Sequence, residues 1–207
     1  MESSRRPNRR GEGARLRAVI VAGATSLLEE SGSEDAVTLR GVARRVGITA
    51  PSIYGHFADR DEMVLAVIAE AFAELDVALA AAAAQDPQDE LRAVCRAYVE
   101  FARKRPNRYR VMFARHRAGD GGAVNDPRSD TDQLAGAKAF SRLVRAVAGS
   151  GHGSPEVAMQ DAVAVWVALH GYVSLRDSVP AFPWPPEETL LEALVSSLTQ
   201  ARPGGTP

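Results

Sequence analysis

The sequence predicts an all-α protein, in which a small N-terminal helix-turn-helix domain precedes a larger helical domain. Three observations lead to this prediction. Apolar residues recur at helical spacing along almost the whole chain, and no strand-like alternation continues for more than a few residues. Two threonines and a glycine within residues 38–49 delimit two short helical segments. The excess of arginine is concentrated at the N-terminal end.

The N-terminal segment is expected to form three helices. The first carries apolar residues at helical spacing and ends before Gly32, which suits a left-handed C-terminal cap. These apolar residues are Leu16, Val19, Ile20, Leu27 and Leu28. Thr38 is expected to cap a second helix that ends at Gly47. Thr49 is expected to cap a third, with Pro51 in its first turn, where a missing amide hydrogen costs little.

The remaining predicted helices are longer. One begins near residues 59–62, whose acidic side chains suit a helix start, and runs to residue 84 before the sequence "DPQDE" breaks it. Glycine, aspartate and proline mark residues 118–130 as a loop, and "PAFPWPP" connects the last two helices. The other helices are expected at residues 91–105, 107–117, 131–149, 154–179 and 186–201.

Composition indicates a soluble protein of the cytoplasm. The 207 residues suffice for one large domain or two small ones, with 45% hydrophobic and 25% charged residues and a formal net charge of -1. The single cysteine, Cys95, cannot form an internal disulfide and fits a reducing compartment. The N-terminal end lacks the apolar stretch of a signal peptide, and the longest uncharged run in the second half is shorter than the ~20 residues that cross a membrane.

Residues 1–17 contain six arginines and two acidic residues. A basic end on a slightly acidic protein favours contact with a polyanion. Residues 1–13 are therefore expected to form a basic, flexible arm that contacts DNA through Arg5, Arg6, Arg9 and Arg10. The alternative is a tail that only increases solubility.

The spacing of small and apolar residues over residues 39–58 is that of a helix-turn-helix. Ala43 provides the small side chain where the two helices cross. Gly47 falls four residues later, at a turn that favours a positive φ. Ile53 follows on the inner face of the second helix. The small and polar residues that face outward can then meet a DNA groove and its phosphates.

The stretch "TLRGVARRVGITAPSIYGHFADRDEMV" resembles the DNA-binding signature of the tetracycline-repressor (TetR) family of bacterial transcription regulators, over residues 15–67. The resemblance implies that Tyr54 and His56 touch phosphates, that Thr49 and Ser52 lie at the groove and that Phe57 fills the three-helix core. Arg60 stands where family members carry a basic residue that contacts the DNA backbone. The full set of candidate DNA contacts in residues 14–60 is Thr38, Arg40, Thr49, Ala50, Pro51, Ser52, Tyr54, Gly55, His56 and Arg60.

This sequence departs from the family pattern at two places. Gly41 replaces an acidic residue or alanine in the first helix of the motif, which weakens that helix by about 1 kcal/mol. The second helix offers few side chains for hydrogen bonds to base edges, so few direct base contacts are expected.

The sequence "VWVALHGYVSL" is similar to the Trp-His-Gly signature of one TetR-family C-terminal domain, with Trp166, His170 and Gly171 in the matching positions. The resemblance implies that residues 61–202 bind a small molecule and form a homodimer through helices at 155–179 and 187–201, before a tail at 203–207. Residues that we expect to line the pocket are Tyr98, Phe101, Met112, Phe113, Phe140, Trp166 and His170. Such a lining favours an apolar or aromatic effector.

Other interpretations remain open at this stage. The aromatic residues, Trp166 and His170 included, could be ordinary core, and Cys95 a small buried hydrophobe or a redox sensor. The cysteine and histidines lack zinc-ligand spacing, so no metal or cofactor is expected. No catalytic frame such as a nucleophile elbow occurs, which argues against an enzyme. We expect a ligand-released repressor that binds near-palindromic double-stranded DNA; the alternatives are an activator, a ligand-independent regulator, or a helical interaction module without DNA binding.

Overall fold

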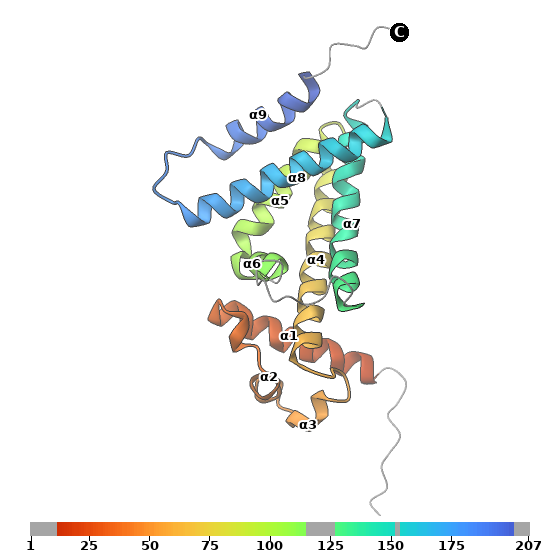
Figure 1. The fold of residues 1–207 in the computed structure, drawn as a ribbon, viewed down its shortest axis with the longest axis vertical. Helices are drawn as coiled ribbons and strands as arrows, with labels where there is room; N and C mark the ends of the chain where they lie inside the picture. Colours follow the sequence, from red (N-terminus) through yellow and green to blue (C-terminus); the bar gives the residue numbers. More distant parts are fainter. Residues whose placement is uncertain (1–11, 115–126, 152–153, 201–207) are drawn as a thin grey trace, which may run out of the picture.

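The computed structural model describes residues 12–114, 127–151 and 154–200, and within these ranges the chain is helical, without strands (Figure 1). The elements in chain order are α1 (Glu12–Ser31), η1 (Glu34–Ala36), α2 (Leu39–Val46), α3 (Ala50–Ile53), α4 (Arg60–Gln85), α5 (Glu90–Lys104), α6 (Pro106–Ala114), α7 (Pro127–Gly149), α8 (Pro155–Ser178) and α9 (Glu187–Gln200). The predicted fold class is therefore confirmed. None of the described helices is long and apolar enough to cross a membrane.

Helices α1, α2 and α3 pack with the first turns of α4 around a small core at one end of the molecule (Figure 1). Ile20, Val42, Ile53, Phe57 and Met63 are all buried there. Phe57 lies at the centre of this core, as expected, and the guanidinium carbon of Arg17 lies 4.6 Å from the centroid of its ring. This core holds the short helix α3, which is too short to be stable alone.

The turn between α2 and α3 has the predicted capping residues at its two ends. Thr38 Oγ1 accepts a hydrogen bond from the backbone N–H of Gly41 at 3.0 Å. Gly47 has φ 73° and donates its backbone N–H to the carbonyl of Ala43, a conformation that a residue with a side chain adopts at a cost. Thr49 precedes α3 without a side-chain capping bond, since its Oγ1 lies 2.8 Å from Ser52 Oγ instead.

Close approach of α1 and α2 depends on a glycine in α1, Gly23. A Cβ atom placed on Gly23 would lie 2.3 Å from Val46 Cγ1. Gly23 thus lets α2, which leads into α3, pack closely on α1. Ala43, where α2 was expected to let α3 cross closely, is buried.

Helix α4 links the two parts of the molecule. Its first half packs on the N-terminal core, and Ala71, Leu75 and Leu79 in its second half belong to a larger core shared with α5, α7, α8 and α9. Helix α7 runs beside α4 (Figure 1), and Arg142 on α7 donates Nε to Asp76 Oδ1 on α4 at 2.5 Å.

The start of α7 differs from the one expected. Helix α7 begins at Pro127, so residues 127–130 are helical where a loop was predicted; proline suits the first turn because no partner is needed there for an amide hydrogen. Helix α8 carries large apolar side chains that are uncovered in the single chain. Val163, Val167 and Leu175 are exposed, Val167 by 60%.

Candidate nucleic-acid interface and internal cavities

The outer surface of the helix-turn-helix carries small and polar side chains. Thr49, Ser52 and Gly55 are exposed, and Tyr54 is 60% exposed although its neighbour Ile53 is fully buried. His56 is half-buried, and its backbone N–H is bonded to the carbonyl of Ile53 at 2.8 Å. This surface offers hydroxyl, phenol and imidazole groups within a short stretch, as groups that contact a phosphate backbone do.

Helix α2 adds positive charge beside α3. Arg45 is paired with Glu30 of α1 at 2.5 Å, and the hydrogen bond from Arg45 lowers the pKa of Glu30 to about 2. Arg40 and Arg44 are exposed, and no ion pair to either occurs among the described residues. Arg40 was expected to contact DNA, whereas Arg44 was missed, although its exposure four residues further along α2 follows from helical periodicity.

Arg60 has intramolecular partners. Its Nε donates to the carbonyl of Val37 at 2.9 Å and its Nη2 to the carbonyl of Glu34 at 2.6 Å. The side chain, which is 33% exposed, thus fixes η1 against the start of α4. Its predicted contact with DNA would use the exposed edge of the guanidinium. The arginines predicted in the N-terminal arm lie outside the described residues.

An apolar cavity of about 650 Å³ lies among helices α4 to α8. Six of the seven residues that were predicted to line the effector pocket lie at the wall of this cavity; they are Tyr98, Met112, Phe113, Phe140, Trp166 and His170. Phe101, the seventh, is buried in the core and is not among the residues that line this cavity. Phe72 on α4 also lines it and was missed; its ring packs edge-on against Phe113 at 5.8 Å between centroids.

A chain of hydrogen bonds lies at the polar side of this cavity. Tyr98 Oη lies 2.9 Å from Tyr109 Oη, which lies 2.7 Å from His170 Nδ1. His170 Nε2 in turn lies 3.5 Å from Ser174 Oγ. Burial raises the pKa of Tyr98 to about 12, so its phenol stays neutral at physiological pH. Tyr109 links the chain, and its place three residues before Met112, on the same side of a helix, was the signal that could have identified it.

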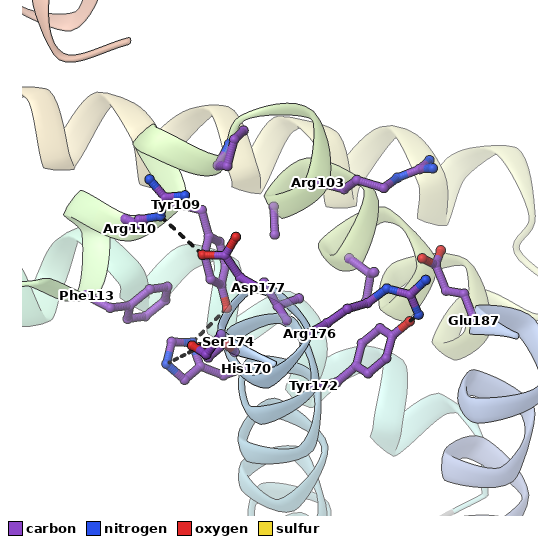
Figure 2. Close-up of a pocket in the computed structure, with 15 residues that line it drawn as sticks. Arg103, Tyr109, Arg110, Phe113, His170, Tyr172, Ser174, Arg176, Asp177 and Glu187 are labelled. Carbon is purple, nitrogen blue, oxygen red and sulfur yellow. Dashed lines mark hydrogen bonds and ion pairs between the residues drawn. The ribbon is translucent and has the colours of Figure 1, made fainter. Parts of the chain in front are cut away.

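A second cavity, of about 450 Å³, adjoins the first, and Phe113 and His170 line both. Figure 2 shows Tyr109, Phe113 and His170 at one end of it and Arg103, Tyr172, Arg176 and Glu187 at the other. Its lining from α5, α6, α8 and the start of α9 is therefore more polar than that of the first cavity. No pattern in the sequence predicts this cavity.

Helix α6 touches both the cavities and the helix-turn-helix domain. Tyr109 and Phe113 face the cavities, whereas Asn107 Nδ2 donates to the carbonyl of Glu29 on α1 at 2.9 Å. Arg108 Nε donates to Glu29 Oε1 at 2.7 Å, and Arg108 Nη1 also binds the carboxylate of Glu74 on α4. Helix α6 therefore borders both cavities and also contacts α1.

No group of three or more potential metal ligands occurs among the described residues. Cys95 is fully buried, and burial raises the pKa of its thiol to about 12. A neutral, buried thiol is a poor nucleophile and a poor metal ligand. Cys95 thus behaves as a small apolar residue of the core.

The fold and these surfaces define an all-helical protein with a helix-turn-helix reading head and a cavity-containing domain. Residues 20–67 match the family model for bacterial regulatory proteins of the tetR family, and residues 91–198 match the tetracyclin repressor-like C-terminal domain. The second match covers more than half of the chain and includes Trp166, His170 and Gly171. The protein belongs to the TetR family of transcription regulators and carries its DNA-binding domain.

One relative and two solved structures are similar to this chain. The chain is 28% identical over 158 residues, 76% of its own length and 68% of the relative's, to the uncharacterised HTH-type transcriptional regulator Rv0681 of Mycobacterium tuberculosis. A protein of unknown function from Rhodococcus sp. RHA1 has a similar fold, with TM-score 0.72, 24% identity and coverage of 95% of this chain and 98% of that one. The multidrug binding protein EbrR, solved with imidazole, has TM-score 0.62 and 19% identity, covering 87% and 93% of the two chains.

Proposed function

We propose that this protein is a cytoplasmic, homodimeric repressor that a small organic molecule releases from a near-palindromic DNA operator. Residues 14–60 serve as the reading head, and residues 61–202 bind the effector and a second copy of the chain. The protein acts by binding and has no catalytic role.

Contact with DNA is supported by the exposed surface of α3. Thr49, Ser52 and Gly55 present little bulk to a major groove, while Tyr54 and His56 flank them with groups suited to phosphate oxygens. The exposed arginines of α2 add favourable charge. A two-fold dimer presents two such surfaces, so the half-sites should lie about 34–36 Å apart, or a multiple of this.

Dimer formation is supported by the apolar face that α8 leaves open. Met159, Val163, Val167 and Leu175 are exposed in the single chain although they are large and apolar. Apolar side chains gathered on one helix are typical of an interface rather than of free surface. A second copy, placed so that α8 and α9 of both chains form a bundle, would remove them from water.

Ligand binding is supported by the size and composition of the apolar cavity. Its volume of about 650 Å³ lies within the ~300–1,000 Å³ typical of small-molecule sites. Phenylalanine and tryptophan rings surround it, and the hydrogen-bond chain from Tyr98 to His170 supplies a few polar groups on one side. EbrR, with a similar fold, is a multidrug binding protein.

The single observation that supports release by a ligand is the position of α6. A molecule that enters the cavities meets Phe113, and any displacement of that helix acts on Glu29 of α1 through Arg108. A ligand shifts DNA affinity only by its differential affinity for two states, and a coupling of about 1–3 kcal/mol is typical. A ligand-independent regulator would share the reading head and lack this dependence.

The experiment is to select genomic DNA fragments with the full-length protein, sequence them and measure binding by gel shift. A shared two-fold symmetric site supports the regulator, and loss of the shifted band with an added cavity ligand supports release. Failure to enrich any sequence would contradict DNA recognition and favour a helical interaction module. Enrichment with a band that no cavity ligand weakens would contradict ligand release alone.

A further inference from the structure

The second, polar cavity suggests what kind of effector fits this protein. It lies next to the apolar cavity, and the two share the side chains of Phe113 and His170 as a common wall. The rings of these two residues are 4.4 Å apart between centroids, in an edge-to-face contact. The same two side chains therefore border both spaces.

Two arginines that line the polar cavity, Arg110 and Arg176, differ in their partners. Arg110 is compensated, because its Nε lies 3.3 Å from Asp177 Oδ2. Arg176 instead donates Nη1 to the phenol oxygen of Tyr172 at 2.7 Å, with its guanidinium 5.6 Å from the centroid of that ring. Within the described residues no carboxylate forms an ion pair with Arg176.

Two further charged groups lie at the same end of the cavity as Arg176 (Figure 2). Arg103 on α5 adds positive charge. Part of this charge is offset by Glu100, whose pKa is lowered mainly by Lys104 and to a smaller extent by the charge of Arg103. Glu187 at the start of α9 adds one negative charge. The Arg176 end therefore carries more positive than negative charge and can accept an anion, with Glu187 opposing it.

We propose that the polar cavity is the second half of the effector site, and that the effector is an amphipathic organic anion. Its apolar body occupies the cavity beside Trp166, and its carboxylate, sulfonate or similar group faces Arg176. This inference rests on the proposed ligand-binding role of the C-terminal domain. It narrows the effector from any apolar molecule to one with a negative charge at one end.

The test uses two probes of the same shape and different charge. They are 1-anilinonaphthalene-8-sulfonate, which is anionic, and N-phenyl-1-naphthylamine, which lacks the sulfonate. Both brighten in apolar surroundings, so fluorescence titration of the full-length protein gives both dissociation constants. Arg176→Gln should raise the dissociation constant of the anionic probe roughly two- to fivefold, which is the size of effect expected for an exposed charge pair. The dissociation constant of the neutral probe should not change.

Three further variants make the test specific. Glu187→Gln removes the opposing charge and should strengthen binding of the anionic probe alone. Arg145 is an exposed arginine of α7 that lines neither cavity. Arg145→Gln should therefore leave the binding of both probes unchanged. Trp166→Ala should weaken both probes, because both place their rings in the apolar cavity.

The proposal is overturned if Arg176→Gln and Glu187→Gln leave the anionic probe unchanged, or if they shift both probes equally. It is also overturned if Trp166→Ala affects neither probe, since the probes would then bind elsewhere. These titrations contain no DNA, so they are independent of operator release. Charge-sensitive probe binding that does not alter DNA affinity would contradict the proposed release mechanism and leave the amphipathic site standing.

Discussion

Arg108 on α6 and Glu29 on α1 join the cavity-containing domain to the reading head, with Arg108 Nε donating to Glu29 Oε1 at 2.7 Å. The Arg108 side chain is only 13% exposed and also binds Glu74 of α4. Such a shielded, doubly paired guanidinium is screened less by salt than a surface pair. Displacement of α6 must therefore move α1 or break this contact.

We predict that Arg108→Gln uncouples effector binding from DNA binding. The variant should keep its affinity for the effector, because the side chain points to α1 and α4 rather than into the cavities. Its DNA affinity should respond less to effector, by about 1 kcal/mol or more of the coupling free energy. Fluorescence anisotropy of labelled operator, measured with and without effector, gives this coupling.

Arg105→Gln is the matched control for this variant. Arg105 lies 3.3 Å from Glu74 Oε2, the same carboxylate that Arg108 binds, and forms no ion pair with α1 among the described residues. Its response to effector should equal that of the wild type. If Arg105→Gln and Arg108→Gln blunt the response equally, coupling runs through α4 and not through Glu29.

Tyr54→Phe and His56→Ala should each weaken DNA binding for all sequences alike. Tyr54 is exposed and outside the core, so removing its hydroxyl affects a phosphate contact and not folding. His56 is half-buried beside Tyr54, so His56→Ala removes a second contact to a phosphate, and gel shifts with several operator sequences measure both losses. An altered sequence preference with unchanged overall affinity would show that these side chains touch bases instead.

Deletion of residues 1–10 tests the N-terminal arm. If Arg5, Arg6, Arg9 and Arg10 neutralise phosphates or enter the minor groove, the deletion lowers the salt slope by about 0.9 for each lost contact. The measurement is operator affinity over a series of salt concentrations. An unchanged slope would leave the arm as a solubilising tail.

Stability should fall at alkaline pH through two buried groups. Burial raises the pKa of Cys95 from 9.0 to about 12 and that of Tyr98 from 10.0 to about 12. Because both native pKa values lie above the unfolded ones, the stabilisation is complete below about pH 9 and is lost as pH rises towards 12. Each group contributes up to about 1.4 kcal/mol per pH unit in this window.

Urea unfolding at pH 8 to 11 measures this loss. Cys95→Ala should lower stability at pH 8 by creating a small cavity and show a shallower decline above pH 9. If the decline is as steep in Cys95→Ala as in the wild type, ionisation of the thiol does not contribute to it.

Local patterns in the sequence predicted the reading head well because its contacts are close in sequence. Thr38 caps the helix that it immediately precedes, and Gly47 ends that helix four residues after Ala43. The partners of Arg60 could not be predicted in this way, since they are backbone carbonyls 23 and 26 residues away that only the folded chain brings near.

The cavities were predicted less completely. The aromatic residues of the sequence identified most of the lining of the apolar cavity. Composition alone, however, does not indicate which side of a helix faces that cavity. Phe101 on α5 was included although it packs in the core, while Tyr109 on α6 was overlooked although it bonds to His170 at 2.7 Å. The charge at Arg176 becomes relevant only once α5, α6 and α8 are placed around one space.

The residues at the cavity wall provide the most direct test of the account. Trp166 is 37% exposed and lines the apolar cavity, and His170 lines both cavities. Trp166→Ala and His170→Ala should therefore fold, dimerise and bind operator. Val165→Ala, at a fully buried neighbour that is not in the lining, is the control and should cost about 2 kcal/mol of stability through lost packing.

The decisive measurement is operator affinity of the wild type, Trp166→Ala, His170→Ala and Val165→Ala, each with and without effector, beside their melting temperatures. We predict that the two cavity variants bind operator normally and lose most of the response to effector. Val165→Ala should melt lower and respond fully. If Trp166→Ala and His170→Ala respond as the wild type does and only melt lower, these residues are core, the effector site lies elsewhere and the account is wrong.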